Sequence, residues 1–115
     1  MNPAERAEPR RGEVWWVAFD PALGGEIRKT RPAIVVSNDV ANRALNRIQV
    51  VPVTGNVTRL YPAEAYVTVG GARRKAMADQ IATASKQRLR EKIGKLDSRE
   101  LAAVERAIKT QLGLV

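Results

Sequence analysis

The chain of 115 residues contains no cysteine and no histidine. The absence of cysteine excludes disulfides and thiolate metal ligands, and it is compatible with a reducing compartment. The absence of histidine removes the side chain that most often acts as acid or base near neutral pH. Any hydrolytic chemistry must therefore use carboxylates, arginine, lysine, tyrosine or hydroxyl groups, and a Ser–His triad is excluded.

Long apolar runs are also missing. No stretch approaches the roughly 20 apolar residues needed to cross a bilayer, and residues 1–11 lack the apolar centre of a secretory signal. Aromatic residues are only 4% of the chain, so we expect a core of Val, Ile, Leu and Ala. We predict a cytoplasmic protein with a flexible tail at residues 1–11 and one domain at residues 12–115.

Acidic residues are comparatively few: the chain has 12 of them against 20 basic residues, which gives a net charge of +8. Such a charge attracts polyanions, and nucleic acid is the usual partner of a small basic domain. A basic surface that only improves solubility is the alternative interpretation. An acidic protein partner is a third, and it is compatible with the first.

The sequence pattern predicts several short strands followed by one helix. Asp97 is suited to cap that helix, and Glu100 follows three residues later as in a capping box. Strands first and a packed helix last predict an α+β or small-barrel architecture. The expected strands are residues 13–19, 33–37, 47–54, 63–69 and 75–81; the expected helical segments are 38–45, 85–91 and 98–112, the last with an apolar stripe of Leu101, Val104, Ile108 and Leu112.

Several motifs occur in a specific order along residues 11–114. They are RGEVWWVAFDP with GGEIRKTRP (11–32), VPVT (51–54), ADQI followed by Thr83 (78–83) and IGKL (93–96). This series resembles the MazF/PemK toxins. The resemblance implies an SH3-like barrel with a C-terminal helix and a homodimer that cuts single-stranded RNA at short sequences. It also implies that no metal or other cofactor is used, and that an acidic antitoxin lies across the RNA site.

The resemblance further implies which residues are catalytic. Arg31 matches the family's arginine before proline, and its guanidinium can hold a phosphate with two hydrogen bonds. Thr54 matches the family's hydroxyl residue at the end of VPVT. Without the resemblance, Arg31 would be interpreted as one half of a surface ion pair and Thr54 as an ordinary strand residue.

Two carboxylates compete for the role of general base. Glu26 and Asp79 each match an acidic position used by some family members, and either could instead pair with a neighbouring arginine. Our hypothesis is that the RNA 2′-hydroxyl attacks the adjacent phosphorus and leaves a 2′,3′-cyclic phosphate and a 5′-hydroxyl. The residues expected to contact RNA are Arg28, Lys29, Thr30, Asn56, Arg59, Gln80 and Thr83.

The chain departs from the family pattern at Ala82 and Met77, where some relatives have arginine. Residues 73–75 are predicted to form a solvated basic turn, with phosphate contact as the alternative, and residues 86–95 an exposed helix face.

Two other functions compete. A gyrase inhibitor of the CcdB type is disfavoured because the C-terminal QLGLV has no aromatic residue, and a non-cutting nucleic-acid-binding barrel because few aromatics are available for stacking.

Overall fold

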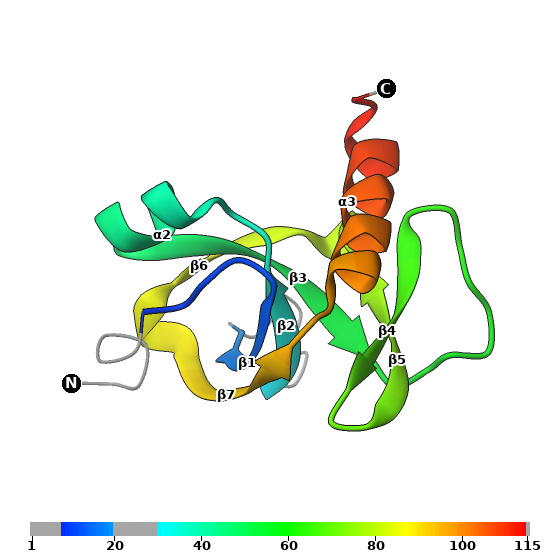
Figure 1. The fold of residues 1–115 in the computed structure, drawn as a ribbon, viewed down its shortest axis with the longest axis horizontal. Coiled ribbons are helices and arrows are strands. Elements are labelled where there is room, and N and C mark those ends of the chain that lie inside the picture. Colours follow the sequence, from blue (N-terminus) through cyan, green and yellow to red (C-terminus); the bar gives the residue numbers. More distant parts are fainter. Residues whose placement is uncertain (1–7, 20–29, 115) are drawn as a thin grey trace, which may run out of the picture.

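The computed structural model describes residues 8–19 and 30–114 of the chain. Within them, one curved antiparallel sheet has helix α3 (Ser98–Leu112) packed beside it (Figure 1). The strand order is β4-β5-β3-β2-β1-β7, with β6 paired to β3. The strands are β1 (Glu13–Ala18), β2 (Thr30–Val35), β3 (Arg47–Thr54), β4 (Glu64–Val69), β5 (Ala72–Met77), β6 (Ala82–Ser85) and β7 (Leu89–Lys95); the short helices are α2 (Asp39–Ala44), η1 (Ala78–Gln80) and η2 (Lys86–Arg88).

Strand β4 also lies near β7, so the two ends of the curved sheet approach each other. The predicted α+β architecture, a small curled barrel with a C-terminal helix, is therefore confirmed. None of the helices in the described residues is long and apolar enough to span a membrane.

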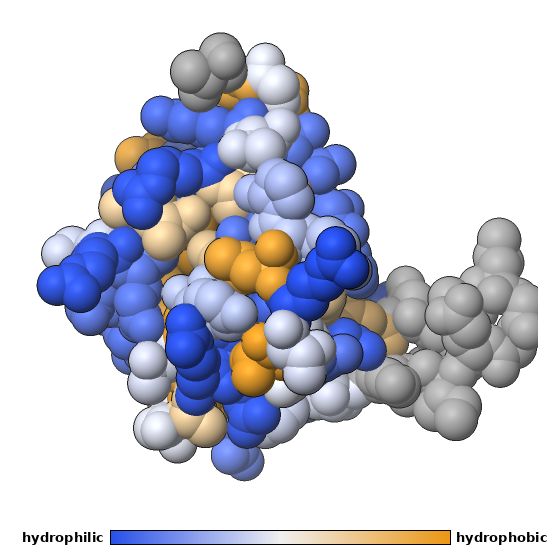
Figure 2. All heavy atoms as spheres, turned by 90° about the vertical axis from the view of Figure 1, so that its right-hand side faces the viewer, coloured by the Kyte–Doolittle hydropathy of each residue, from blue (hydrophilic) through white to orange (hydrophobic). Residues whose placement is uncertain are grey.

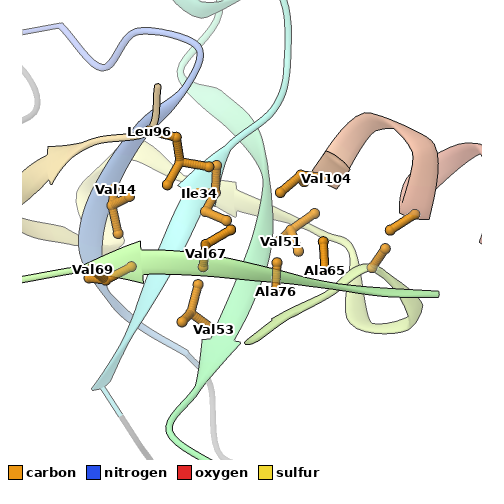
Figure 3. Close-up of a cluster of buried hydrophobic side chains, with 12 residues drawn as sticks. Val14, Ile34, Val51, Val53, Ala65, Val67, Val69, Ala76, Leu96 and Val104 are labelled. Atoms are coloured by element: carbon orange, nitrogen blue, oxygen red, sulfur yellow. The ribbon is translucent and has the colours of Figure 1, made fainter. Parts of the chain in front are cut away.

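Two hydrophobic clusters fill the two faces of the sheet. The first contains Val14, Ile34 and Val53 and packs against α3 through Val104 (Figure 3). The second contains Trp15 and Val17 from β1, together with residues of β2, β3, β6 and β7. Each fully buried aliphatic side chain contributes roughly 1.5–3 kcal/mol through burial. Both faces of β1 are thus covered at Val14, Trp15 and Val17, but Trp16 remains 40% exposed.

Strand β3 joins the two parts of the sheet because its outer partner changes along its length. Its first half pairs with β6 as far as Val50, and its end pairs with β5 from Val53 onward. Pro52 lies between these two ladders while its other side faces Ala33 of β2. A residue without a backbone N–H is tolerated where one side of the ladder is interrupted. Pro52 therefore lies where β3 changes its partner.

The expected basic helix at residues 85–91 is wrong. Only η2 forms a single 3-10 turn there, and the basic run continues as strand β7, paired with β1. The β1–β7 register shifts twice, between Val14 and Trp15 and between Trp15 and Val17. Such bulges add residues to one strand and reset its alternation. Leu89 therefore packs in the second cluster and Ile93 against the first, so the regular alternation of a strand is interrupted here.

The strand expected at residues 75–81 begins earlier, at Ala72, and ends at Met77, where η1 follows. Gly70 and Gly71 form the turn between β4 and β5, with φ values of 60° and 79°. Two central residues with positive φ define the tight hairpin turn that glycine favours. Since this turn needs only two residues, Arg73 and Arg74 belong to β5, and their assignment to a solvated turn is wrong.

Helix α3 begins as predicted, because the Asp97 side chain accepts a hydrogen bond from the Glu100 N–H at 2.8 Å. Glu100 does not complete a capping box. Its carboxylate instead accepts the backbone N–H of Thr68 on edge strand β4 at 2.7 Å. Leu112, expected in the apolar stripe, is 51% exposed because the last turns extend past the sheet (Figure 1), and the buried side chains of α3 are Val104 and Ala107.

The end of the predicted tail is attached to the domain. Arg11 binds the Val36 carbonyl and forms an ion pair with Glu105 at 2.8 Å. The nearby Glu13 carboxylate is buried, which would raise its pKa, but hydrogen bonds from Lys92, the Arg10 N–H and Trp15 lower it. The pKa of Glu13 therefore lies below its ordinary value.

Candidate active site

The register of β2 and β3 brings the two expected catalytic residues together. Ala33 pairs with Pro52 and Ile34 with Val51, and continuing this antiparallel register by two residues sets Arg31 opposite Thr54. Both side chains line one open hollow of about 340 Å³ at the ends of the two strands. Its other lining residues are Thr30, Pro32, Val53 and Gly55.

Arg31 is half-buried and pairs through its backbone with Val17 of β1. Pro32 follows it and disfavours helical backbone at Arg31. The ion pairs within the described residues involve Arg11, Lys75 and Lys92, and none of the described residues lining the hollow is acidic. The guanidinium of Arg31 thus stands at the hollow without a carboxylate from the described part of the chain, as a site for an anionic ligand requires.

Thr54 is oriented by the turn that follows it. Its Oγ1 accepts the backbone N–H of Asn56 at 3.3 Å. A hydroxyl has one proton to donate and two lone pairs, so this contact leaves the Thr54 O–H available to donate. The Asn56 side chain in turn accepts from the N–H and the hydroxyl of Thr58. Asn56, expected to contact RNA, thus helps to shape the turn beside Thr54.

A second hollow of about 330 Å³ adjoins the first. The two share Pro32, Val53, Thr54 and Gly55, and the second is also lined by Trp16, Val69, Gly70, Arg74 and Ile93. It lies where β1, β4, β5 and β7 meet. The guanidinium of Arg74 lies over Gly55, since a Cβ built on that glycine would be 2.8 Å from the Arg74 Nη1.

Trp16 and Arg74 were not singled out from the sequence as functional residues. Trp16 belongs to the strand predicted at residues 13–19. Arg74 was assigned to a basic turn, with phosphate contact as the minor alternative. The Gly70-Gly71 pair could have indicated the position of Arg74. A two-residue turn at these glycines places Arg74 on the same face of β5 as the buried Ala76.

The neighbouring cations of the β4–β5 hairpin are held by partners within the protein. The guanidinium of Arg73 lies 3.7 Å from the ring centre of Tyr66, whose hydroxyl donates to the Val57 carbonyl. Lys75 is buried and forms an ion pair with Glu64 at 2.9 Å. Burial would raise the pKa of Glu64, but hydrogen bonds from Lys75 and the Tyr61 N–H outweigh it and lower the pKa.

Arg59, expected to contact RNA, also has partners. Its guanidinium lies 5.2 Å from the ring centre of Tyr61 and its carbonyl accepts from Lys75. Figure 2 shows the side of the molecule to which this hairpin belongs, where strongly hydrophilic side chains lie next to small hydrophobic areas. The surface beside the second hollow is therefore basic, but its cations Arg59, Arg73 and Lys75 already interact with other groups of the protein.

The remaining predicted residues are spread more widely. Asp79 and Gln80 are exposed in η1 and line neither hollow; the Gln80 amide contacts the Met77 sulfur. Thr83 lies on β6 and accepts a hydrogen bond from Gln49. Glu26, Arg28 and Lys29 lie outside the described residues. The structure thus brings together Thr30, Arg31 and Thr54 but leaves Asp79 apart from them.

Comparison with known proteins shows the family of the chain. The model of the PemK-like, MazF-like toxins of type II toxin–antitoxin systems matches residues 10–112, and the chain belongs to this family. The endoribonuclease MazF9 of Mycobacterium tuberculosis is 43% identical over 114 residues, which cover 91% of this chain and 97% of the relative.

Solved structures agree with the assignment. A MazF from Deinococcus radiodurans superposes with a TM-score of 0.78 and 28% identity, covering 91% of this chain and 96% of that one. An endoribonuclease from a mycobacterial species, solved in complex with its cognate antitoxin, gives a TM-score of 0.77 at 26% identity over 93% of this chain and 97% of that one. Fold and family together place the chain among the MazF-type endoribonuclease toxins.

Proposed function

We propose that this toxin cuts single-stranded RNA at specific sequences without a metal ion and that the hollow between Arg31 and Thr54 holds the scissile phosphate. The observation that carries the proposal is that Arg31 of β2 and Thr54 of the neighbouring β3 line one open hollow. Membership in a family whose relatives are named endoribonucleases supports the same activity.

The chemistry follows from the side chains present. The 2′-hydroxyl of the ribose attacks the adjacent phosphorus, and the 5′-oxygen leaves, giving a 2′,3′-cyclic phosphate and a 5′-hydroxyl. Arg31 stabilises the negative charge that develops on the equatorial oxygens, since its planar fork suits a phosphate and it stays protonated. The Thr54 hydroxyl donates to a second oxygen.

A carboxylate is needed to accept the proton of the 2′-hydroxyl. Glu26 precedes Arg31 by five residues in the sequence, whereas Asp79 lies in η1 and lines neither hollow. We propose that Glu26 is the base and that Asp79 is the alternative, for the case in which a second copy of the chain completes the site. Glu26→Gln and Asp79→Asn separate the two, because only the variant that lacks the base should lose most of its cleavage rate while it still binds RNA.

The proposal extends to the partners of the protein. Related toxins have been solved with their antitoxins, and we propose that an acidic antitoxin segment covers the hollow of this chain and blocks RNA. We also propose that the toxin acts as a homodimer in the cytoplasm, where its RNA substrates are found. The residues proposed to contact the RNA are Arg28, Lys29, Thr30, Asn56, Arg59, Gln80 and Thr83.

The test uses the purified full-length chain with a long transcript in the presence of EDTA. We expect cleavage at a short consensus sequence, with cyclic phosphate and 5′-hydroxyl ends, and no cleavage of the same sequence as DNA, which lacks the attacking hydroxyl. Products with 5′-phosphate ends, or activity that disappears with EDTA, would contradict the proposed chemistry. An intact transcript after incubation with pure protein would contradict the activity itself.

A further inference from the structure

The hollow beside the catalytic one combines apolar walls with a single guanidinium. Its walls are formed by Pro32, Val53, Val69 and Ile93, and the exposed indole of Trp16 stands at its border. Val53 and Val69 belong to the first hydrophobic cluster (Figure 3), so the hollow is the open end of that core. Among the described residues that line it, Arg74 is the one charged group.

This composition selects one kind of ligand. A phosphate would gain one guanidinium contact but would lose its hydration against apolar walls, which is costly for an anion. A planar group with apolar faces and a polar edge suits both the apolar walls and the guanidinium. Its faces contact the walls and the indole of Trp16, and its edge accepts hydrogen bonds from Arg74. A nucleobase has this shape, and base stacking on an aromatic side chain contributes about 1–3 kcal/mol.

The volume and the position agree with such a ligand. At about 330 Å³ the hollow is at the lower end of small-molecule sites. It shares Pro32, Val53, Thr54 and Gly55 with the hollow that holds Arg31. A nucleotide in the second hollow is therefore adjacent to the phosphate in the first, as consecutive units of one strand must be.

We propose that the hollow between Trp16 and Arg74 binds the nucleobase next to the scissile phosphate and that Arg74 selects guanine at this position. The inference rests on the proposed cleavage of RNA. An arginine fork pairs with the two acceptors O6 and N7 of guanine, which is the commonest specific contact of arginine with a base. Adenine presents a donor in place of O6 and forfeits one of the two hydrogen bonds.

Gly55 makes room for this guanidinium. A Cβ at residue 55 would lie 2.8 Å from the Arg74 Nη1, and the clash involves the far end of a flexible side chain. The variant Gly55→Ala therefore moves the guanidinium out of place while the charge of the protein is unchanged. It tests position separately from charge.

The first experiment maps cut sites on a randomised RNA pool. For the parent protein we expect guanine to be preferred at one position beside the cut, and Arg74→Gln should lower that preference about tenfold or more while cutting continues. Arg106→Gln, which removes an exposed arginine of α3, is the matched control and should keep the parent profile. A parent profile without guanine beside the cut, or equal profiles for the two variants, would overturn the inference.

The double variant separates a direct effect from an indirect one. Gly55→Ala and Arg74→Gln should each weaken the guanine preference, and their combination should weaken it no further than Arg74→Gln alone, because both act through one guanidinium. Additive losses would show that Gly55 acts by another route and would overturn the role assigned to the arginine's position.

A binding measurement keeps the inference testable if no cutting is seen. The probes are 2′-O-methyl oligonucleotides, which cannot be cleaved, with guanine or another base at one position of an otherwise constant hexamer. Guanine should bind about tenfold more tightly and quench the fluorescence of Trp16 in the parent but not in Trp16→Phe. Equal affinity for every base would overturn the inference. It would also be overturned if an antitoxin segment bound in the hollow and none of the oligonucleotides did.

Discussion

Two groups of cations lie close together but have opposite environments. Arg73 and Lys75 of the β4–β5 hairpin form one group, and Arg31 and Arg74, which line the two hollows, form the other. On the hairpin, Arg73 is stacked on Tyr66 and Lys75 is paired with the buried Glu64. At the hollows, Arg31 and Arg74 have no carboxylate among the described residues that line them. Cations whose interactions are satisfied within the fold contribute to its stability, whereas cations left open toward a cavity are available for a ligand.

The comparison explains why net charge alone is a poor guide to the site. A chain with a charge of +8 has many arginines and lysines, and a count does not tell which of them are already bonded. Substitutions should therefore divide into two groups, with hairpin variants changing stability and hollow variants changing cleavage. The following predictions test this division, beginning with the largest expected effect.

The variant Glu64→Gln should destabilise the protein most. It leaves the Lys75 ammonium buried without its counter-charge, and breaking a buried pair on one side costs about 3–5 kcal/mol. Thermal or urea unfolding measures the loss. The double variant Glu64→Leu with Lys75→Met should recover much of it, because no unpaired charge remains. Equal instability of the single and double variants would show that shape rather than charge is decisive.

The same pair should make stability depend on pH. The pKa of Glu64 and that of Glu13 are both lowered in the folded protein from the ordinary value of 4.5. Groups with lowered pKa contribute stability that is complete above the ordinary value and is lost as the pH falls through the folded value. The free energy of unfolding should therefore decrease on acidification below about pH 4.5, and less steeply in Glu64→Gln.

The variant Arg31→Ala should slow cleavage about 100–1,000-fold, the effect of removing one strong donor to a charged transition state. Its unfolding temperature should stay near that of the parent, since no ion pair within the described residues is lost. Cleavage rates on a short RNA and a melting curve provide the two measurements. Arg106→Ala on the exposed face of α3 is the control, and an Arg31 variant as fast as this control would place the active site elsewhere.

The variant Thr54→Val keeps the shape of the side chain and removes the hydroxyl. We expect cleavage to slow by roughly 10–100-fold, because a hydrogen bond to a charged group contributes about 1.5–3 kcal/mol. Thr54→Ser, which restores a hydroxyl, should recover most of the rate. If serine and valine were equally impaired, the methyl group and not the hydroxyl would be the important part.

The variant Glu105→Gln should have the smallest effect. Its ion pair with Arg11 is partly exposed, with 43% of the Glu105 side chain accessible. Exposed pairs contribute at most about 1 kcal/mol. Unfolding measurements should therefore show little change, in contrast to Glu64→Gln. A loss as large as that of the buried pair would mean that the N-terminal attachment through Arg11 is essential to the fold.

Much of the fold follows from local sequence, but β7 does not. The alternation in β4 and the turn at Gly70-Gly71 can be recognised in the sequence, because β4 keeps the regular period of two of a strand. In β7, two bulges against β1 interrupt this period, so that Leu89 packs in one cluster and Ile93, four residues later, packs against the other. Bulges are set by the partner strand, so the sequence of β7 alone does not reveal them.

The candidate site shows the same division. Arg31 and Thr54 could be selected because each lies in a motif with the right neighbours. Arg74 and Trp16 could not, since their importance arises only when β1, β4, β5 and β7 meet around one hollow. The expected contribution of Leu112 to the core failed for a related reason, because the length of the sheet decides how many turns of α3 are covered.

The bond from the Thr68 N–H to Glu100 has a consequence for how copies of the chain can associate. Strand β4 ends the sheet, and an outer strand with free backbone groups is a template for adding strands from other molecules. The first turn of α3 places a carboxylate on one of those groups. Contacts between chains through the β4 edge are thereby disfavoured, which guards a protein made largely of short strands against ordered aggregation.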